Sequence, residues 1–598
     1  MTTPTEIDQD EMMARKLQAE YDLEYAMSQE HEEPEAGKSS HNQQEVVSAN
    51  TSKDETENID QSRSSRLIDT RPLCKYGGKC YRENPLHFME YRHSGEANSR
   101  EVTESPRKKL KSHDVRVEQP RVETKEHSQD QAEPDQMCNK YSYYLSKVRG
   151  LNNNYNSRTS SIHIREILAL EKSELISSIQ FNYMFDVSWL LDQYPEDYRK
   201  NPVLIVHGYS GQSRNNLEQQ GQPFPNVKFH QAKLEMAYGT HHSKMMFLLY
   251  SNGLRIVIHT ANLIPQDWGR RTQGIWISPL FLKRSDKSEM NIADDTGFKQ
   301  DLMDYVASYG PALFEWRSRI MEHDMSSVNV FLIASVPGRH AGKNIDKWGH
   351  LKLRKILKRN GPSKDDVSAN WPAICQFSSI GSLGSKRDAW LYSEFRTSLS
   401  STSTTRLSQL GERKADVKLI FPSVENVRNC LEGYKGGSCL PYNRGTANKQ
   451  PWLNSLLHNW AAKKTGRHRA SPHIKTYTRV SPDNTELAWF LITRQVANLS
   501  KAAWGTMEKN ETQLMIRSYE IGVLFLPKQF GDGKTFKTCD LKTNWLIPYD
   551  LPLIPYGLQD SPWTWDTPHL EPDTHGAQWI PGGYKAFRES RYDKEEQP

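Results

Sequence analysis

Two short sets of residues combine side chains that could cleave a phosphate ester without a metal ion. Each set has a histidine, a lysine two positions later and an asparagine further on: His242, Lys244 and Asn262 in one, His473, Lys475 and Asn498 in the other. The same frame surrounds both asparagines, because Ala-Asn-Leu, four residues and Trp-Gly occur at 261–269 and again at 497–505. Two such copies indicate two related halves that contribute to one site.

The chemistry that suits these residues is phosphoryl transfer. A lysine about 4 Å from a phosphate is worth roughly 4 kcal/mol at an effective dielectric constant near 20, and an asparagine adds a neutral donor. Histidine titrates near neutral pH, so one copy can attack phosphorus while the other acts as an acid. No acidic cluster accompanies the two sets, which argues against a two-metal nuclease.

The elements that must position these residues are buried strands. Apolar runs at 245–250 and 254–258 predict two strands directly after Lys244. Residues i and i+2 of a strand share a face, so His242 and Lys244 would project together from one sheet edge. Other apolar runs alternate with helix-like stretches. We therefore predict an α/β fold of two similar mixed-sheet lobes, related by a pseudo-twofold.

The lobe boundaries follow from the position of the two sets. We expect the first lobe over residues 137–330, the second over residues 331–588 and a charged tail over residues 589–598. The chain has seven cysteines without the spacing of a disulfide framework. Four of them are expected to be reduced thiols: Cys375, Cys430, Cys439 and Cys539.

Charge is unevenly placed along the chain. Residues 1–36 hold eleven acidic and two basic side chains, so they carry −9, whereas the whole chain carries +5. The remaining residues therefore carry +14, which favours an anionic partner. The N-terminus lacks the pattern of a secretory signal, and no run approaches the roughly 18 apolar residues of a membrane span. We expect a soluble intracellular protein without a membrane partner.

The first 70 residues are expected to form a disordered tail that carries one helix. Residues 8–28 have helical periodicity, with Met13, Leu17 and Tyr21 on one face around Ala14. This helix resembles the ubiquitin-interacting motifs, which would make ubiquitin a partner. A stray amphipathic helix is the alternative interpretation.

Residues 71–95 contain four potential metal ligands with the spacing C-x5-C-x6-H-x5-H: Cys74, Cys80, His87 and His93. Two thiolates and two imidazoles suit a tetrahedral structural zinc ion. So short a segment has no core of its own, so the metal would supply the folding energy.

The same segment resembles the poly(ADP-ribose)-binding zinc fingers, whose pattern is C-x-[FY]-G-x-x-C-Y-R-x-N-P-x-H-F. The resemblance implies that Tyr81 and Arg82 hold the adenine and phosphate of that polymer, which stacking and a bidentate donor would favour. Two departures are Glu83, where a basic residue is usual, and Ser94-Gly95-Glu96 in place of Pro-Gly-Asp.

Residues 96–136 form a polar linker with a basic cluster at 106–111. Such a cluster is either a nuclear import signal or a solvated charge run. Because it adjoins a finger of this type, we expect the nucleus as the main compartment, with the cytoplasm as a second one.

The histidine and lysine sets are similar to those of the phospholipase D superfamily. From Tyr141 to Tyr584 the chain resembles one branch of it, the type 1 tyrosyl-DNA phosphodiesterase family. Four further stretches carry the likeness: QFNYMFDVSWL at 180–190, SSIGSLG at 378–384, RSYEIGVLFLP at 517–527 and AQWIPGGYKAF at 577–587. The aspartate that the superfamily places five positions after the lysine is replaced by Leu249 and Val480. Its absence is typical of this branch.

The resemblance implies a DNA repair enzyme that hydrolyses 3′-phosphotyrosyl and related 3′ adducts, such as those left by topoisomerase I, without a metal. His242 would form a covalent phosphohistidine, and His473 would protonate the departing tyrosine and then activate water to leave a 3′-phosphate. Glu520 would orient His242, and Gln273 would orient His473. These carboxylate and amide partners would make the two histidine pKa values diverge.

The resemblance also implies a substrate track for a single strand or a nicked 3′ end with an attached peptide. Four residues occupy the family's strand positions, namely Tyr183, Tyr238, Ser379 and Ser382, and Trp579 lies on the peptide side. The stretch before Asn498 is two residues longer than in the family, which a β-bulge could absorb. We expect a monomer.

Two rival functions are a lipid-cleaving phospholipase of the same superfamily and a weakly catalytic scaffold recruited by poly(ADP-ribose) and ubiquitin. A lipid-cleaving phospholipase would require the aspartates that are missing here. The two complete histidine and lysine sets argue against a weakly catalytic scaffold.

Overall fold

The computed structural model describes residues 140–581, apart from residue 158 and residues 285–294, 404–413, 494–497 and 539–544. The predictions for the tail helix, the zinc finger, the linker and the last ten residues fall outside the described residues. Of the four cysteines expected to be reduced, Cys375, Cys430 and Cys439 are free and buried, and Cys539 lies outside the described ranges.

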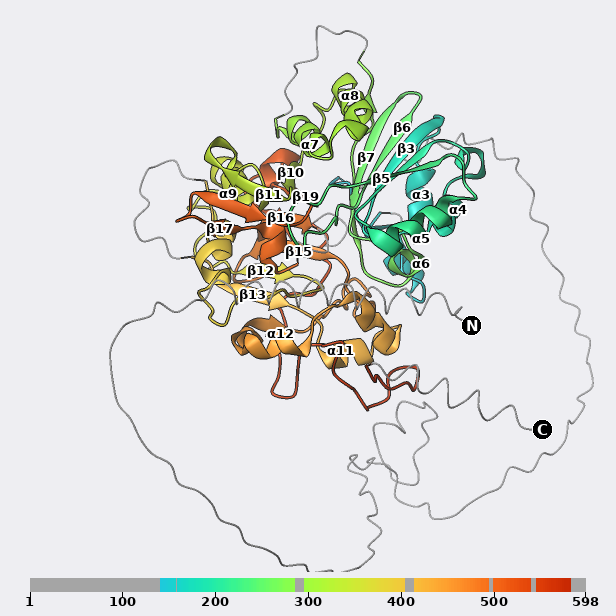
Figure 1. The fold of residues 1–598 in the computed structure, drawn as a ribbon. Helices are drawn as coiled ribbons and strands as arrows, with labels where there is room; N and C mark the ends of the chain where they lie inside the picture. Colours follow the sequence, from blue (N-terminus) through green and yellow to red (C-terminus); the bar gives the residue numbers. More distant parts are fainter. Residues whose placement is uncertain are drawn as a thin grey trace, which may run out of the picture. The chain divides into compact units, whose positions relative to one another are not determined.

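The first of two large sheets contains nine strands, and Figure 1 labels β3, β5, β6 and β7 of this sheet. Their order is β2-β1-β8-β7-β6-β3-β4-β5, and β9 pairs with β7. The bounds are β1 Tyr143–Ser146, β2 Ser161–Ile162, β3 Leu175–Phe181, β4 Val203–His207, β5 Val227–Gln231, β6 Met245–Tyr250, β7 Gly253–His259, β8 Gly274–Ile277 and β9 Phe281–Leu282. The apolar runs predicted as strands therefore form β6 and most of β7.

The second sheet contains eight strands in the order β10-β19-β16-β15-β12-β13-β14, and β20 pairs with β16. The bounds are β10 Phe331–Ser335, β12 Ala373–Gln376, β13 Val417–Ile420, β14 Leu457–His458, β15 Lys475–Val480, β16 Glu486–Thr493, β19 Glu520–Phe525 and β20 Phe536–Lys537. A small sheet joins β11 (Gly338–Ala341), β18 (Gln513–Ile516) and β17 (Thr506–Glu508).

Helices lie between these strands in both halves of the chain. Those of the first half are α3 Ile164–Leu168, α4 Val187–Gln193, α5 Gly211–Gly221, α6 Pro265–Gly269, α7 Phe298–Ala307 and α8 Phe314–Glu322. Those of the second half are α9 Gly349–Asn360, α10 Arg396–Leu399, α11 Val424–Arg428, α12 Arg444–Lys449 and α13 Lys501–Trp504. The expected mixed α/β class is thus confirmed.

The two sheets repeat one topology. In the first, β3 pairs antiparallel with β6 and parallel with β4, and β6 pairs antiparallel with β7. In the second, β12 pairs antiparallel with β15 and parallel with β13, and β15 pairs antiparallel with β16. The repeat of the histidine and lysine sets in sequence is therefore a repeat of the fold.

The two sheets share a hydrophobic core. Phe247 and Ile258 of the first sheet belong to one buried cluster with Ile492 and Val523 of the second. The sheets come so close that a Cβ on Gly274 of β8 would lie 3.2 Å from the Ile492 side chain of β16. The opposite face of the first sheet is covered by α3, α4 and α5, which explains strands that are apolar on both faces.

Candidate active site

Both histidines lie in extended segments that lead into buried strands. β6 begins at Met245, one residue after Lys244, whereas β15 begins at Lys475 itself. His242 and Lys244 thus lie just before their strand, and the Lys244 carbonyl already accepts from the His259 N–H of β7 at 3.3 Å. All four histidine and lysine side chains of the two sets are fully buried.

The backbone of each half holds the histidine of the other. The His242 N–H donates to the Tyr519 carbonyl at 3.2 Å, and the His473 N–H donates to the Thr272 carbonyl at 2.9 Å. Parallel bridges join the same segments, between His241 and Tyr519 and between Thr272 and Pro472. These symmetric contacts bring the two sets to one junction between the sheets.

A tyrosine covers His242. The Tyr183 ring stacks on the imidazole with centroids 3.9 Å apart, and the Lys244 Nζ lies 5.6 Å from the same ring. Tyr183 follows β3, and its N–H donates to the Asn182 side chain at 2.8 Å. A residue predicted to contact DNA is therefore packed against the candidate nucleophile and is only 4% exposed.

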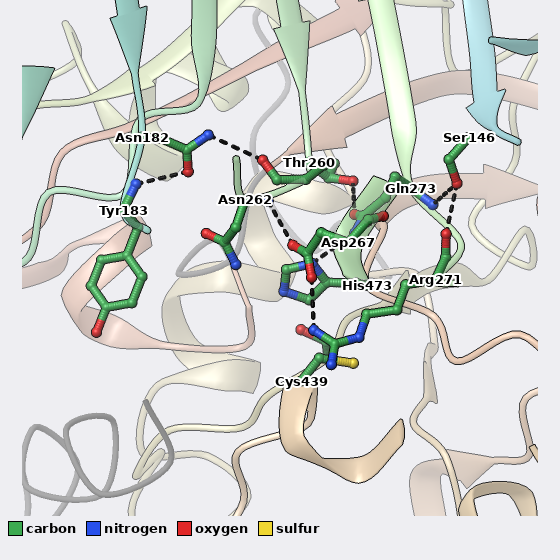
Figure 2. Close-up of polar contacts among 12 residues, drawn as sticks. Ser146, Asn182, Tyr183, Thr260, Asn262, Asp267, Arg271, Gln273, Cys439 and His473 are labelled. Atoms are coloured by element: carbon green, nitrogen blue, oxygen red, sulfur yellow. Dashed lines mark hydrogen bonds and ion pairs between the residues drawn. The ribbon is translucent and has the colours of Figure 1, made fainter. Parts of the chain in front are cut away.

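The Nδ1 atom of His473 faces two side chains from the first half (Figure 2). Gln273 Nε2 lies 3.0 Å away, and a carboxylate oxygen of Asp267 lies 3.1 Å away. The opposite ring nitrogen, Nε2, has no hydrogen-bond partner among the described residues. That free nitrogen is the one available to a substrate.

Burial dominates the titration of His473. Desolvation and then the charge of Lys475 lower its pKa to about 3, while Asp267 acts in the opposite direction. Burial by itself would raise the pKa of the Asp267 carboxyl. The nearby His473, Arg271 and the Asn262 N–H outweigh that effect and hold it below its ordinary value.

Asp267 is a site residue that the sequence did not reveal. One of its oxygens accepts from the Asn262 N–H at 2.6 Å, and the other from Arg271 Nη1 at 2.7 Å. Behind them, Arg271 Nε lies 3.5 Å from a carboxylate oxygen of Glu432. When the two copies are aligned on their Trp-Gly pairs, Asp267 corresponds to Ala503 of the second copy. A search for residues shared by both copies therefore misses Asp267.

The two asparagines differ in their hydrogen bonds. Neither side-chain atom of Asn262 has a partner in the described part of the chain. The Asn498 side-chain oxygen, in contrast, accepts from the N–H groups of Ser378 and Ser379, both at 3.0 Å. The longer stretch before Asn498 includes residues 494–497, which the structure does not describe.

The asparagines nevertheless occupy equivalent places. A parallel bridge joins Leu499, next to Asn498, to Ile380, and another joins Leu263, next to Asn262, to Phe185. The two additional residues therefore leave Asn498 in register with its counterpart.

Glu520 occupies the place in the second half that Gln273 has in the first. Each directly follows the residue whose carbonyl accepts the histidine N–H of the other half. Glu520 is the first residue of β19 and is buried. This symmetry puts it beside the His242 segment.

The remaining predicted contact residues differ in accessibility. Tyr238 is 40% exposed and has a φ of 61°, whereas Ser379 is fully buried and its hydroxyl donates to the Pro441 carbonyl at 2.6 Å. Ser382 is half-buried. The Trp579 indole N–H donates to the Trp565 carbonyl at 2.7 Å, and the ring is half-buried. Ser379 is thus as deeply buried as the two histidines, and its hydroxyl has an internal acceptor.

Comparison with known proteins identifies the family of this chain. The family model described as tyrosyl-DNA phosphodiesterase matches residues 142–557. The chain belongs to the tyrosyl-DNA phosphodiesterase family. Tyrosyl-DNA phosphodiesterase 1 of Drosophila melanogaster is 39% identical over 424 residues, which are 69% of this chain and 71% of that protein. Its Arabidopsis thaliana counterpart is 37% identical over 475 residues, covering 71% and 74% of the two chains.

The fold of this phosphodiesterase is also that of a solved relative. The crystal structure of the yeast tyrosyl-DNA phosphodiesterase superposes with a TM-score of 0.53 at 20% identity, covering 71% of this chain and 99% of that one. As a family member, the chain is a hydrolase of phosphodiester bonds. A second family model, the PBZ domain, matches residues 71–96. Within the described ranges, no helix has the length and apolar character needed to cross a membrane.

Proposed function

We propose that this phosphodiesterase acts in DNA repair by hydrolysing 3′-phosphotyrosyl and related 3′-blocking adducts, through a covalent phosphohistidine. One observation carries the proposal. Each half supplies a buried histidine and lysine to one junction, and each histidine is held by the backbone of the other half. Such an arrangement provides a nucleophile and an acid for one phosphate.

In the first step, an imidazole nitrogen of His242 forms a bond to phosphorus while the bond from phosphorus to the tyrosyl oxygen breaks. His473 Nε2 gives its proton to that oxygen. In the second step, water attacks phosphorus, the bond to His242 breaks, and His473 Nε2 takes the water proton, which leaves a 3′-phosphate.

Substrate binding prepares the acid. In the free protein, burial and Lys475 favour neutral His473. A bound phosphodiester brings a negative charge to the same place, which raises the pKa of His473 and favours its protonated form. Lys244 and Lys475 would face the nonbridging oxygens, and the Asn262 amide, which has no partner among the described residues, would add a preorganised donor. No step requires a metal.

The DNA strand is proposed to reach the phosphate past Tyr238 and Tyr183. Exposed Tyr238 offers a base-stacking surface, and Tyr183 closes the site over His242. Ser379 and the half-buried Ser382 would line the same strand track, and the Ser379 hydroxyl, which donates to the Pro441 carbonyl, keeps its lone pairs as acceptors. The half-buried Trp579 would face the peptide.

The N-terminal region is proposed to recruit the enzyme. The donor set of Cys74, Cys80, His87 and His93 fits a structural zinc ion, because soft thiolates and imidazoles in this number close a tetrahedral site. The finger would bind poly(ADP-ribose) through Tyr81 and Arg82 at sites of DNA damage in the nucleus. Ubiquitin is a proposed partner of residues 8–28, whose sequence predicts a helix.

Turnover of a 3′-phosphotyrosyl oligonucleotide tests the proposal. Wild type should release a 3′-phosphate end, and His242→Ala should reduce the rate by at least about 1,000-fold. His473→Ala should slow the first step and block the second, so that a covalent protein–DNA adduct accumulates on a denaturing gel. The exposed His468 supplies the control, since His468→Ala should leave the rate unchanged. Retained turnover in His242→Ala would refute the assignment.

A further inference from the structure

Asp267 stands next to the acid of the proposed reaction but belongs to neither repeated set. Its carboxylate lies 3.1 Å from His473 Nδ1 and is fully buried. We propose that Asp267 is the positioning residue that keeps a proton on His473 Nδ1, so that Nε2 can give a proton in the first step and take one in the second. This inference rests on the proposed two-step hydrolysis.

The orientation of Gln273 shows why another acceptor is needed. The Asp267 carbonyl can only accept, so the Gln273 NH2 group, 3.2 Å away, points toward it and toward His473 Nδ1. The Gln273 oxygen then faces the Thr260 hydroxyl, which donates to it at 2.6 Å. An amide N–H can bind Nδ1 only when that nitrogen carries no proton.

The tautomer that Gln273 favours cannot do the chemistry. When Nδ1 carries no proton, neutral imidazole carries its proton on Nε2. A protonated Nε2 cannot accept a proton from water. As an acid, the imidazolium needs an acceptor for its Nδ1–H, and Gln273 offers a donor instead. Asp267 is the acceptor at hydrogen-bond distance, so it stabilises both the imidazolium and the neutral form whose Nε2 is free.

The surroundings of Asp267 keep it ionised. Its two oxygens are bound by the Asn262 N–H at 2.6 Å and by Arg271 Nη1 at 2.7 Å. The charges that act on His473 from the packed segments are Asp267, Arg271 and Lys475. Only Asp267 among these favours the imidazolium, so it opposes both cations.

The two halves place their carboxylates at different positions of the repeat. Asp267 precedes the Trp-Gly pair, where the second half has Ala503. Glu520 follows the residue that binds a histidine N–H, where the first half has Gln273. His473 therefore has a carboxylate of the opposite half at hydrogen-bond distance, whereas the carboxylate next to the His242 segment, Glu520, comes from a different site of the repeat. The environments of the two histidines are thus unequal.

The test compares two leaving groups in Asp267→Asn, Asp267→Glu and Gln273→Ala. Tyrosyl oxygen needs a proton to depart, whereas 4-nitrophenolate does not. In Asp267→Asn, single-turnover cleavage of the 3′-phosphotyrosyl oligonucleotide should fall by about 100-fold or more, with an unchanged KM. The first burst of nitrophenolate from the matching 3′-(4-nitrophenyl) phosphodiester should stay within about threefold of wild type, because that step needs no acid.

Two further measurements separate catalysis from folding. Asp267→Glu should restore part of the lost rate, and Gln273→Ala should cost less than about tenfold, since it removes only the competing donor. Loss of the carboxylate lowers the pKa of His473, so the alkaline limb of the pH–rate profile should move to lower pH in Asp267→Asn.

Three outcomes would overturn the inference. Equal loss with both leaving groups would make Asp267 purely structural. A larger loss of rate in Gln273→Ala than in Asp267→Asn would assign the positioning of His473 to the Gln273 amide. An alkaline limb at the same pH in Asp267→Asn and wild type would show that Asp267 does not affect the pKa of His473. A wild-type protein that cleaves neither substrate would instead refute the proposed function itself.

Discussion

At the scale of single residues, the two asparagines occupy equivalent positions in the repeat but have different roles. Asn262 is fully buried, and its amide has no partner among the described residues. Asn498 is also buried, but its oxygen accepts from two backbone N–H groups of the Ser378 loop. A buried amide without partners normally costs stability, so Asn262 is a place where the fold gives up stability for a substrate contact.

Replacing each asparagine by leucine should separate these two roles. Asn262→Leu breaks no side-chain hydrogen bond among the described residues, so the free energy of unfolding should be unchanged or rise, while turnover of the phosphotyrosyl oligonucleotide falls at least about tenfold. Asn498→Leu leaves two N–H groups without an acceptor and should cost about 2–4 kcal/mol. Urea unfolding followed by fluorescence checks both, and equal stability losses would contradict the distinction.

At the scale of elements, the site depends on loops that are pinned by the opposite half. The segment from Gly239 to Lys244 runs beside residues 517–519, and the Thr240 hydroxyl binds the Ser518 hydroxyl at 2.8 Å. A Cβ on Gly239 would lie only 2.4 Å from the Arg517 carbonyl oxygen. A backbone oxygen cannot move aside as the end of a flexible side chain can. Only a glycine at position 239 therefore allows the two segments to lie this close together.

Gly239→Ala should therefore displace the nucleophile's loop. We expect a loss of about 1–3 kcal/mol in unfolding free energy and a lower kcat, since small shifts of a catalytic group are costly. Gly557→Ala is the control, because its nearest neighbour would lie at an ordinary 3.6 Å from the new Cβ. A Gly239→Ala enzyme with wild-type kcat and stability would show that the loop does not need this contact.

The N-cap of α3 makes a stability prediction that depends on pH. His163 Nδ1 accepts from the Arg165 N–H, and burial lowers the pKa of His163 to about 4. The unfolded chain binds the proton near pH 6.5 while the folded chain does not, so stability falls as the pH drops from about 6.5 to 4. At pH 5 this one group costs up to about 2 kcal/mol.

His163→Asn should remove that penalty and keep the cap acceptor. We expect urea midpoints close to wild type at pH 7 and a more stable variant at pH 5. Parallel pH dependences in the two proteins would show that His163 does not contribute to the acid lability.

At the scale of the whole molecule, catalysis and recruitment are expected to depend on different chemistry. EDTA should leave turnover of the phosphotyrosyl oligonucleotide unchanged and abolish binding to poly(ADP-ribose), because only the finger would need zinc to fold. Cys74→Ala should reproduce the EDTA result without a chelator. Metal-dependent turnover, or polymer binding that survives Cys74→Ala together with Tyr81→Ala, would contradict this division.

The sequence by itself determined the local features of this protein. The repeated histidine, lysine and asparagine sets, the apolar runs that became β6 and β7, and the absence of the aspartate at Leu249 and Val480 are all readable over a few residues. Periodicity and spacing act along the chain, so they indicate strand positions, the two halves and the chemistry without a structure.

Only the tertiary structure decided which residues complete each half of the site. Asp267 meets His473 across more than two hundred residues, and Ser379 turns its hydroxyl inward to Pro441. The backbone contacts of His242 with Tyr519, and of His473 with Thr272, cross between the halves. These pairings depend on how two similar sheets pack against a shared core, and no local pattern encodes that contact.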